Sequence, residues 1–159
     1  MANYWNQEGV PHKGWEYETI IDLRDEGEDY ETCMMCGREE IRYVHILSHD
    51  EVAEVYRVGC VCAEKMTNDY ANPKERQRQL ENRAKRKENW KYKEWKLNLK
   101  GNSYYKFEEH LLVIFRDNKT KKFKCIIDGK FGIKSYVYLS EAKEAIFNKI
   151  EEMKEKGSW

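Results

Sequence analysis

Four cysteines, arranged as two closely spaced pairs, constrain the fold of this chain more than any other feature. Two residues separate Cys33 from Cys36, a glycine follows directly, and one residue separates Cys60 from Cys62. A Cys-x-x-Cys-Gly turn directs two sulfurs toward one ion, and zinc takes four nitrogen or sulfur ligands in a tetrahedron. We therefore predict a zinc site with Cys33, Cys36 and Cys62 as ligands.

The fourth zinc ligand has two possible sources in the sequence. Cys60 reaches the metal if it ends a strand while Cys62 begins a helix. His45 and His49 are the alternatives, because residues four apart on a strand lie on the same face of a sheet. Four protein ligands would leave no open position for water, so we expect the zinc to be structural rather than catalytic.

Two interpretations without zinc compete with this one. Buried reduced cysteines are common in proteins, and a redox Cys-x-x-Cys pair usually begins a helix after a strand, whereas Cys33 follows an acidic loop. The first residues lack the pattern of a signal peptide, and no apolar run has the length of a membrane span. We therefore expect a cytoplasmic protein without membrane contact, where clustered cysteines indicate metal rather than disulfides.

The residues around the cysteines predict the order of a treble-clef zinc module. Residues 41–48 and 52–58 are rich in β-branched and aromatic side chains, which favours two strands of a hairpin. A short helix is expected from about Cys62 to about Tyr70, and a further strand over Tyr17–Leu23. A cysteine turn, a hairpin and a helix then follow one another, and the helix N-terminus suits thiolates.

The net charge of zero, from 29 basic and 29 acidic residues, conceals an uneven distribution. Residues 1–32 contain two basic and nine acidic side chains, whereas residues 73–100 contain eleven basic and four acidic ones. Asn72, Pro73 and Glu75 form a helix start signal, so we predict one long basic helix that runs to about Leu97 or Leu99. Such a segment indicates an anionic partner or an acidic segment folded against it.

The last third of the chain predicts a β-β-β-α unit. Strands are expected over residues 110–116, 123–128 and 133–139, followed by a helix that Ser140 caps. The predicted fold class is α+β, with a treble-clef-like zinc module, a long basic helix and this unit. The predicted domains are an acidic aromatic segment (1–32), a zinc-binding module (33–72), a basic linker helix (73–100) and a β-β-β-α domain (101–159).

Cations interleaved with aromatic residues favour nucleic-acid binding, since cations contact phosphates and aromatic rings stack on unpaired bases. The candidate residues on the helix and the C-terminal sheet are Arg76, Arg78, Arg83, Lys85, Arg86, Lys87, Lys91, Lys93, Lys124, Lys134 and Tyr136. The alternative function is a protein-interaction or inhibitor module, such as one that a phage encodes, with a purely structural zinc. No nucleophile elbow, phosphate loop or His-Glu-x-x-His motif is present, so we do not expect an enzyme.

Two stretches of the chain resemble a group of uncharacterised bacterial and phage-type proteins. They are Cys-Met-Met-Cys-Gly-Arg-Glu-Glu-Ile-Arg-Tyr-Val-His (33–45) and Val-Gly-Cys-Val-Cys-Ala-Glu (58–64), and Gly-Val-Pro-His-Lys-Gly-Trp (9–15) also matches. The resemblance covers nearly the whole chain but implies no activity. More distant members keep a cysteine at the position of Cys62 and not at that of Cys60, so the resemblance makes Cys60 the less secure ligand.

Overall fold

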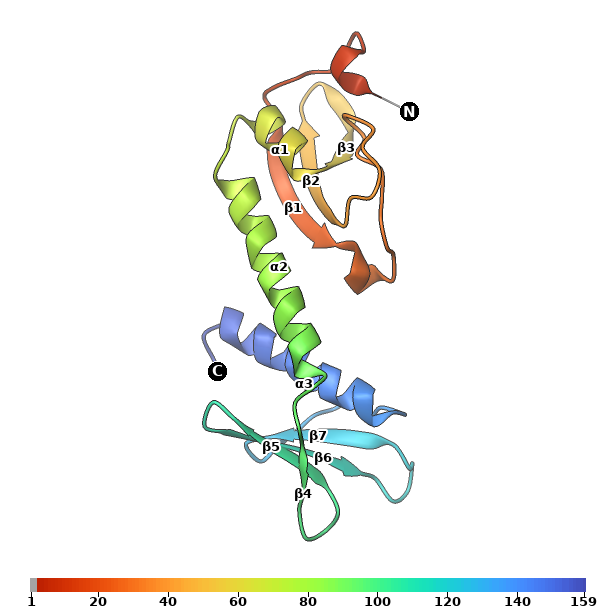
Figure 1. Cartoon of the computed structure of the whole chain (residues 1–159), viewed down its shortest axis with the longest axis vertical. Helices are drawn as coiled ribbons and strands as arrows, with labels where there is room; N and C mark the ends of the chain where they lie inside the picture. The colour runs from red at the N-terminus through yellow and green to blue at the C-terminus, as the bar shows by residue number, and fades with distance from the viewer. Residues whose placement is uncertain (1–2) are drawn as a thin grey trace. The chain divides into compact units, whose positions relative to one another are not determined.

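The computed structural model of the chain describes residues 3–159. In this part of the chain it contains three α-helices and two antiparallel sheets, which confirms the predicted α+β class. The chain divides into two compact units, one up to Arg83 and one over Ala84–Trp159, and Figure 1 shows the elements of each. Among the described residues, no helix combines the length and the apolar character needed to cross a bilayer.

The first unit is built on a three-stranded antiparallel sheet in the order β1-β2-β3. Its strands are β1 (Glu16–Asp22), β2 (Tyr43–His49) and β3 (Val52–Val58). The bounds of β3 agree with the prediction, and those of the other two differ by one or two residues. Two short 3₁₀ helices, η1 (Tyr4–Asn6) and η2 (Leu23–Glu26), flank β1 in the sequence.

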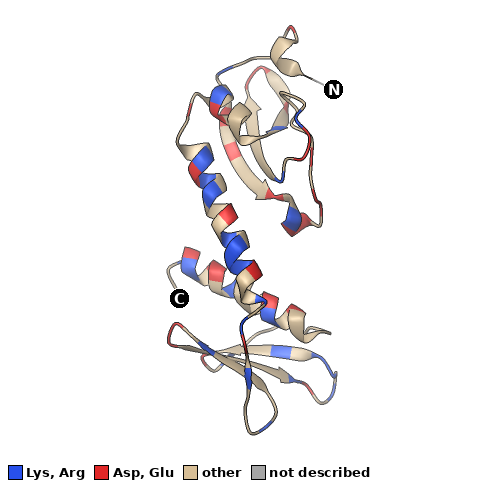
Figure 2. Ribbon diagram, viewed as in Figure 1, with Lys and Arg blue, Asp and Glu red and all other residues tan. Residues whose placement is uncertain are grey.

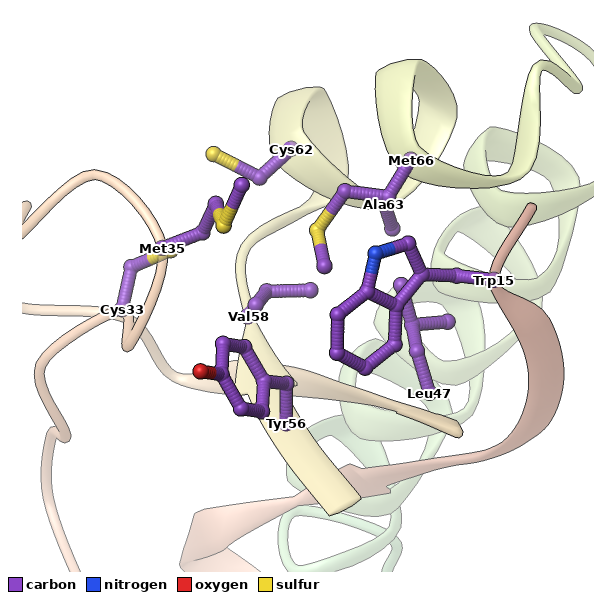
Figure 3. Packing of buried hydrophobic residues seen from close by; sticks show 9 residues of the cluster. All are labelled: Trp15, Cys33, Met35, Leu47, Tyr56, Val58, Cys62, Ala63 and Met66. Atoms are coloured by element: carbon purple, nitrogen blue, oxygen red, sulfur yellow. The ribbon is translucent and has the colours of Figure 1, made fainter. Parts of the chain in front are cut away.

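The core of the first unit lies between this sheet and the short helix α1 (Cys60–Thr67). Leu47 of β2 pairs with Tyr56 of β3, and both side chains point to the buried face. From α1, Ala63 and Met66 complete the layer, since residues three apart share one face of a helix. Figure 3 shows the cluster, which consists of Trp15, Cys33, Met35, Leu47, Tyr56, Val58, Cys62, Ala63 and Met66. Two predicted zinc ligands therefore belong to this core.

The helix α2 (Asn72–Trp90) begins one residue before the predicted range of 73–100, and it has a different cap. The carboxylate of Asp69 accepts the backbone N–H groups of Ala71 and Asn72, both at 3.0 Å. Glu75, predicted to close a capping box, instead accepts hydrogen bonds from the guanidinium of Arg78.

The prediction that this helix reaches Leu97 or Leu99 is wrong, because α2 ends at Trp90. Trp90 is buried in the core of the second unit, where its Nε1–H donates to the carbonyl of Lys143 at 2.8 Å. Beyond it, the side chains of Tyr92 and Leu99 are exposed, so their burial does not stabilise further helical turns.

The second unit contains a five-stranded antiparallel sheet in the order β4-β5-β6-β7-β8, where the prediction had three strands. Its strands are β4 (Lys96–Leu97), β5 (Ser103–Phe107), β6 (His110–Arg116), β7 (Phe123–Ile127) and β8 (Lys130–Phe131). The strands β6 and β7 confirm two predictions. The strands β4 and β5 occupy residues that were predicted to end the helix or to form a loop.

The predicted strand over residues 133–139 is wrong, and with it the simple β-β-β-α arrangement. Only Tyr136 from this segment pairs with the sheet, through two backbone hydrogen bonds to Phe123. Ile133 is 99% exposed and Val137 is 58% exposed, so the apolar alternation in the sequence does not mark a buried face here.

The helix α3 (Leu139–Glu155) covers one face of the second sheet (Figure 1). Its cap is Tyr138 rather than the predicted Ser140, and the carboxylate of Glu141 accepts the backbone N–H of Tyr138 at 3.2 Å. The buried residues between helix and sheet are Trp90, Leu112, Ile114, Ala142, Ile146, Phe147 and Ile150. This core is separate from the core that contains the cysteines.

Candidate metal centre and basic surfaces

Three of the four predicted cysteine ligands lie together in the structure. The sulfurs of Cys33, Cys36 and Cys62 all lie within 4.8 Å of one another. Zn–S bonds of about 2.3 Å in a tetrahedron separate two sulfurs by about 3.8 Å, so three such sulfurs fit around one ion. Among the residues that the structure describes, no other group of three cysteine, histidine or acidic side chains is as close together.

Two separate elements hold these sulfurs in place. Cys33 and Cys36 belong to a turn in which the N–H of Gly37 donates to the carbonyl of Cys33 at 2.9 Å. Gly37 has a φ of 76°, a left-handed conformation that glycine adopts without strain. Cys62 comes from the first turn of α1, and the N–H of Gly59 is directed at the sulfur of Cys33 at 3.5 Å. The turn and the helix therefore meet at the three sulfurs.

The electrostatics of the cluster favour a thiolate in the absence of metal. The Cys62 thiol and the backbone N–H groups directed at Cys33 hold the pKa of Cys33 well below its usual range, although burial acts in the opposite direction. The pKa of Cys62 is raised, because its proton is held in the hydrogen bond to the Cys33 thiolate and because it is buried. The two sulfurs therefore share a proton that a bound cation would displace.

Cys60 lies outside this cluster. It is the first residue of α1, and residues two apart on a helix project toward nearly opposite sides, so Cys60 and Cys62 point in different directions. The Cys60 thiol donates to the carboxylate of Glu64 at 3.6 Å. Burial, with the carboxylate of Glu64 as the second cause, raises the pKa of Cys60 to about 11.

The two alternative histidine ligands are both engaged elsewhere. The ring of His45 is fully buried, with Nδ1 accepting from the Tyr17 hydroxyl at 2.6 Å and Nε2 at 2.9 Å from Oε1 of Gln77. This pattern corresponds to a neutral imidazole, and burial lowers the pKa of His45. His49 Nε2 bonds the carbonyl of Lys13, and its Nδ1 accepts the N–H of Glu51, both at 3.1 Å. Neither ring joins the three sulfurs.

A cavity of about 260 Å³ opens beside the cysteine cluster. All three clustered cysteines and Cys60 line it. Its remaining lining residues are Arg38, Glu40, Ile41, Arg42, Tyr43, Gly59, Val61 and Gln77. The candidate metal centre thus borders on open space that several polar side chains surround.

Most of the candidate phosphate-binding cations between Arg76 and Lys93 have acidic or aromatic partners within the chain. Blue basic and red acidic residues alternate along the helix in Figure 2. The guanidinium of Arg76 lies over the ring of Tyr17, 4.2 Å from its centroid. The ion pairs are Arg78–Glu75, Arg83–Asp25, Arg86–Glu151, Lys87–Glu144 and Lys91–Glu88. Lys85 and Lys93 are exposed.

The three candidate residues of the second unit differ in their positions. The Lys124 ammonium pairs with the carboxylate of Asp117 at 3.3 Å, and Lys134 is exposed. Tyr136 packs against the core beneath α3 rather than on the open face of the sheet. Its aromatic ring is therefore not available for stacking in the way that the sequence suggested.

The open face of the second sheet carries a set of residues of which only Lys124 was predicted from the sequence. Leu112 and Ile114 of β6 point toward α3, so the residues that alternate with them point away from it. Cross-strand pairing places residues of the neighbouring strands beside these. This set, here called the outer sheet face, consists of Lys96, Tyr104, Lys106, Leu111, Val113, Phe115, Lys124, Ile126 and Phe131. None of these nine residues is acidic.

The outer sheet face combines aromatic rings with lysines and is partly hollowed. Phe131 is 70% exposed, and its ring meets that of Phe115 edge to face with centroids 5.9 Å apart. A shallow groove of about 540 Å³ lies over Leu97, Asn98, Leu99, Tyr104, Lys106, Leu111 and Val113. The alternation of residues in β6 predicts which of its side chains lie on this face. The residues of β4 and β5 on the same face could not be assigned, because these two strands were not predicted.

Comparisons of the chain with protein-family models, curated proteins and solved structures give no match. The resemblance to bacterial and phage-type proteins therefore stays a prediction.

Proposed function

We propose that the protein is a zinc-stabilised module that binds single-stranded nucleic acid through its outer sheet face. The zinc part of the proposal rests on three cysteine sulfurs within 4.8 Å of one another. Thiolates are soft ligands that favour zinc among the abundant divalent ions, and zinc does not undergo redox reactions.

A treble-clef-like organisation is part of this proposal. The cysteine turn, the β2–β3 hairpin and α1 follow one another in the order that such a module requires. Cys33 and Cys62 lie in the hydrophobic core, so a bound ion would tie the turn and the helix to the sheet beneath them. The role assigned to the metal is therefore structural support of the first unit.

Metal content tests the first part of the proposal. Protein expressed in zinc-supplemented medium should retain one zinc ion per chain after dialysis, measured by plasma emission spectrometry. Cys33→Ser should lose the ion, and Cys125→Ser is the matched control, because Cys125 lies in the second unit and outside the cluster. Retention of zinc by Cys33→Ser would contradict the proposal.

The nucleic-acid part rests on the composition of the outer sheet face. Tyr104, Phe115 and Phe131 offer rings on which bases can stack, and Lys96 and Lys106 offer cations for phosphates. Aromatic residues on an open sheet face are a recurring platform for unpaired bases. No carboxylate among the nine residues repels the phosphates, whereas many cations of α2 already have acidic partners.

A fluorescence anisotropy titration with a labelled 12-mer of oligo(dT) or oligo(U) tests this part. Binding should weaken between 50 and 200 mM salt. A plot of the logarithm of the binding constant against the logarithm of the salt concentration should have a slope of about −0.7 per phosphate contact. Phe131→Ala should cost about 1–3 kcal/mol of binding free energy, the typical contribution of one stacked base. Phe131 is exposed, so the variant should keep its fold.

The control in this titration is Lys93→Gln, which changes an exposed cation just after the end of α2. If Lys93→Gln weakens binding as much as Lys106→Gln, the contact surface is the basic segment rather than the outer sheet face. Absence of any binding at 50 mM salt to DNA or RNA would refute the nucleic-acid proposal.

One observation favours a protein partner as the second candidate. The groove on the outer sheet face is lined by apolar Leu97, Leu99, Leu111 and Val113, and Leu99 is fully exposed. Apolar exposed patches mark protein-binding surfaces. Specific binding of one protein that persists at high salt and after nuclease treatment would favour this candidate.

A further inference from the structure

We infer that the metal centre keeps one coordination position for an external ligand, a small polar thiol. This inference rests on the metal binding proposed above and concerns the position that no side chain of residues 3–159 fills. Three sulfurs converge, and zinc takes four ligands. Three protein ligands with one open position is the arrangement of zinc sites that bind exchangeable ligands.

The local geometry argues against Cys60 as the fourth ligand. Because α1 begins at Cys60, its side chain leaves the helix on a different side from that of Cys62. Its thiol is bonded to Glu64, a carboxylate that is only 6% exposed and whose other partner is the ammonium of Lys74 at 3.8 Å. If Cys60 turned toward the cluster, the buried Glu64 carboxylate would lose the thiol, the closer of its two partners. Leaving a buried carboxylate with fewer partners costs free energy.

The histidines do not fill the position either. His45 has both ring nitrogens in hydrogen bonds inside the first unit, and it is fully buried. Releasing it would leave the Tyr17 hydroxyl and the Gln77 amide without this partner. The Nε2 of His49 is bonded to the Lys13 carbonyl, and its ring lies edge to face with Trp15 at 5.2 Å between centroids.

The cavity beside the sulfurs provides room for a ligand. Its volume of about 260 Å³ is several times that of one water molecule, so a small organic molecule fits. The lining includes Arg38, Glu40 and Gln77, which suit a polar molecule rather than a hydrocarbon. A metal that already has soft sulfur ligands favours a further soft donor, and the simplest is a thiolate.

Cobalt substitution tests the inference, because the absorption of Co²⁺ reports the number of bound thiolates through sulfur-to-cobalt charge transfer. The full chain is loaded with Co²⁺ in a buffer that contains a phosphine as the reductant and no thiol. The probe is 2-mercaptoethanol, and ethylene glycol is the matched molecule without sulfur. The variants are Cys60→Ala, with Cys60→Ser as a substitute if the alanine variant does not fold, and Cys62→Ser.

The expected result is the same three-thiolate spectrum for the wild type and for Cys60→Ala. In both, 2-mercaptoethanol should raise the charge-transfer absorption saturably toward that of four thiolates, and ethylene glycol should not. A four-thiolate spectrum that falls in Cys60→Ala, or no response to 2-mercaptoethanol, would overturn the inference while the metal centre stands. If Co²⁺ and Zn²⁺ both fail to bind, or bind equally well to Cys62→Ser, the proposed metal centre itself is refuted.

Discussion

The stability that zinc adds to the first unit can be calculated and tested with Cys36→Ser. Cys36 is half-buried, unlike Cys33 and Cys62, so its replacement by serine should remove a ligand with little damage to the core. At a free zinc concentration 100-fold above the dissociation constant, binding stabilises the folded state by about 2.7 kcal/mol. In a unit that ends at Arg83, each kcal/mol shifts the melting temperature by about 4–8 °C. Zinc should therefore raise this melting temperature by about 10–20 °C.

Differential scanning calorimetry measures this shift, and hydrogen exchange of peptides from β2 and β3 identifies the transition of the first unit. The wild type and Cys60→Ser should both show the zinc-dependent rise, because Cys60 lies outside the sulfur cluster. Cys36→Ser should show almost none, while the metal-free melting temperatures of all three proteins stay close together. A full zinc shift in Cys36→Ser would refute the assignment of this ligand, and its loss in Cys60→Ser would make Cys60 a ligand.

Three further predictions concern the fold. Burial lowers the pKa of His45 in the folded chain, so below about pH 6.5 the unfolded chain binds a proton that the folded chain does not, and the contribution of His45 to stability is complete above this pH and falls below it. Urea unfolding of metal-free protein should give a smaller free energy of unfolding at pH 5.5 than at pH 7.5. An equal loss in His45→Asn would contradict this prediction. Leu112→Ala should cost about 2–5 kcal/mol in the second unit, since Leu112 is fully buried, and calorimetry should find the first transition unchanged. Trp90→Phe should destabilise the same transition by about 0.5–1.5 kcal/mol, the net contribution of one hydrogen bond, because the Lys143 carbonyl loses the indole donor and keeps its bond within α3. No change would contradict the role of Trp90 in ending α2.

The elements that the sequence predicted well are those with a strong local pattern. The strands β3 and β6 are rich in apolar and aromatic residues and are bounded by turn residues, and their bounds agree with the prediction. The stripe of Ala142, Ile146 and Ile150 in α3 is buried as its spacing indicates. Local pattern and tertiary burial point the same way in these elements.

The position of Cys60 depended on a detail that the sequence does not reveal. The prediction began the helix at about Cys62, which would leave Cys60 on an extended segment with its sulfur free to turn toward the metal. The helix begins two residues earlier, at Cys60, and this shift alone redirects the side chain. Helix ends are the least predictable part of a helix, and here the end decides the ligand set.

The short strands β4 and β8 could not be predicted because two residues carry no period. They exist only through their partners, since Lys96 and Leu97 pair with β5 and Lys130 and Phe131 pair with β7. The end of α2 has the same cause, because the helix stops where Trp90 is buried in the core of the second unit. Such features follow from tertiary contacts rather than from local propensity.

The closeness of the three sulfurs also determines how a purified sample of this protein oxidises in air. Thiols this near one another need only a small movement to come within bonding distance, and Cys33 has strong thiolate character. A chelator used in air should therefore yield an internally cross-linked species with no capacity for zinc, rather than an empty site that can be refilled. Batches purified with and without reductant would then differ covalently while their masses differ by only two hydrogens.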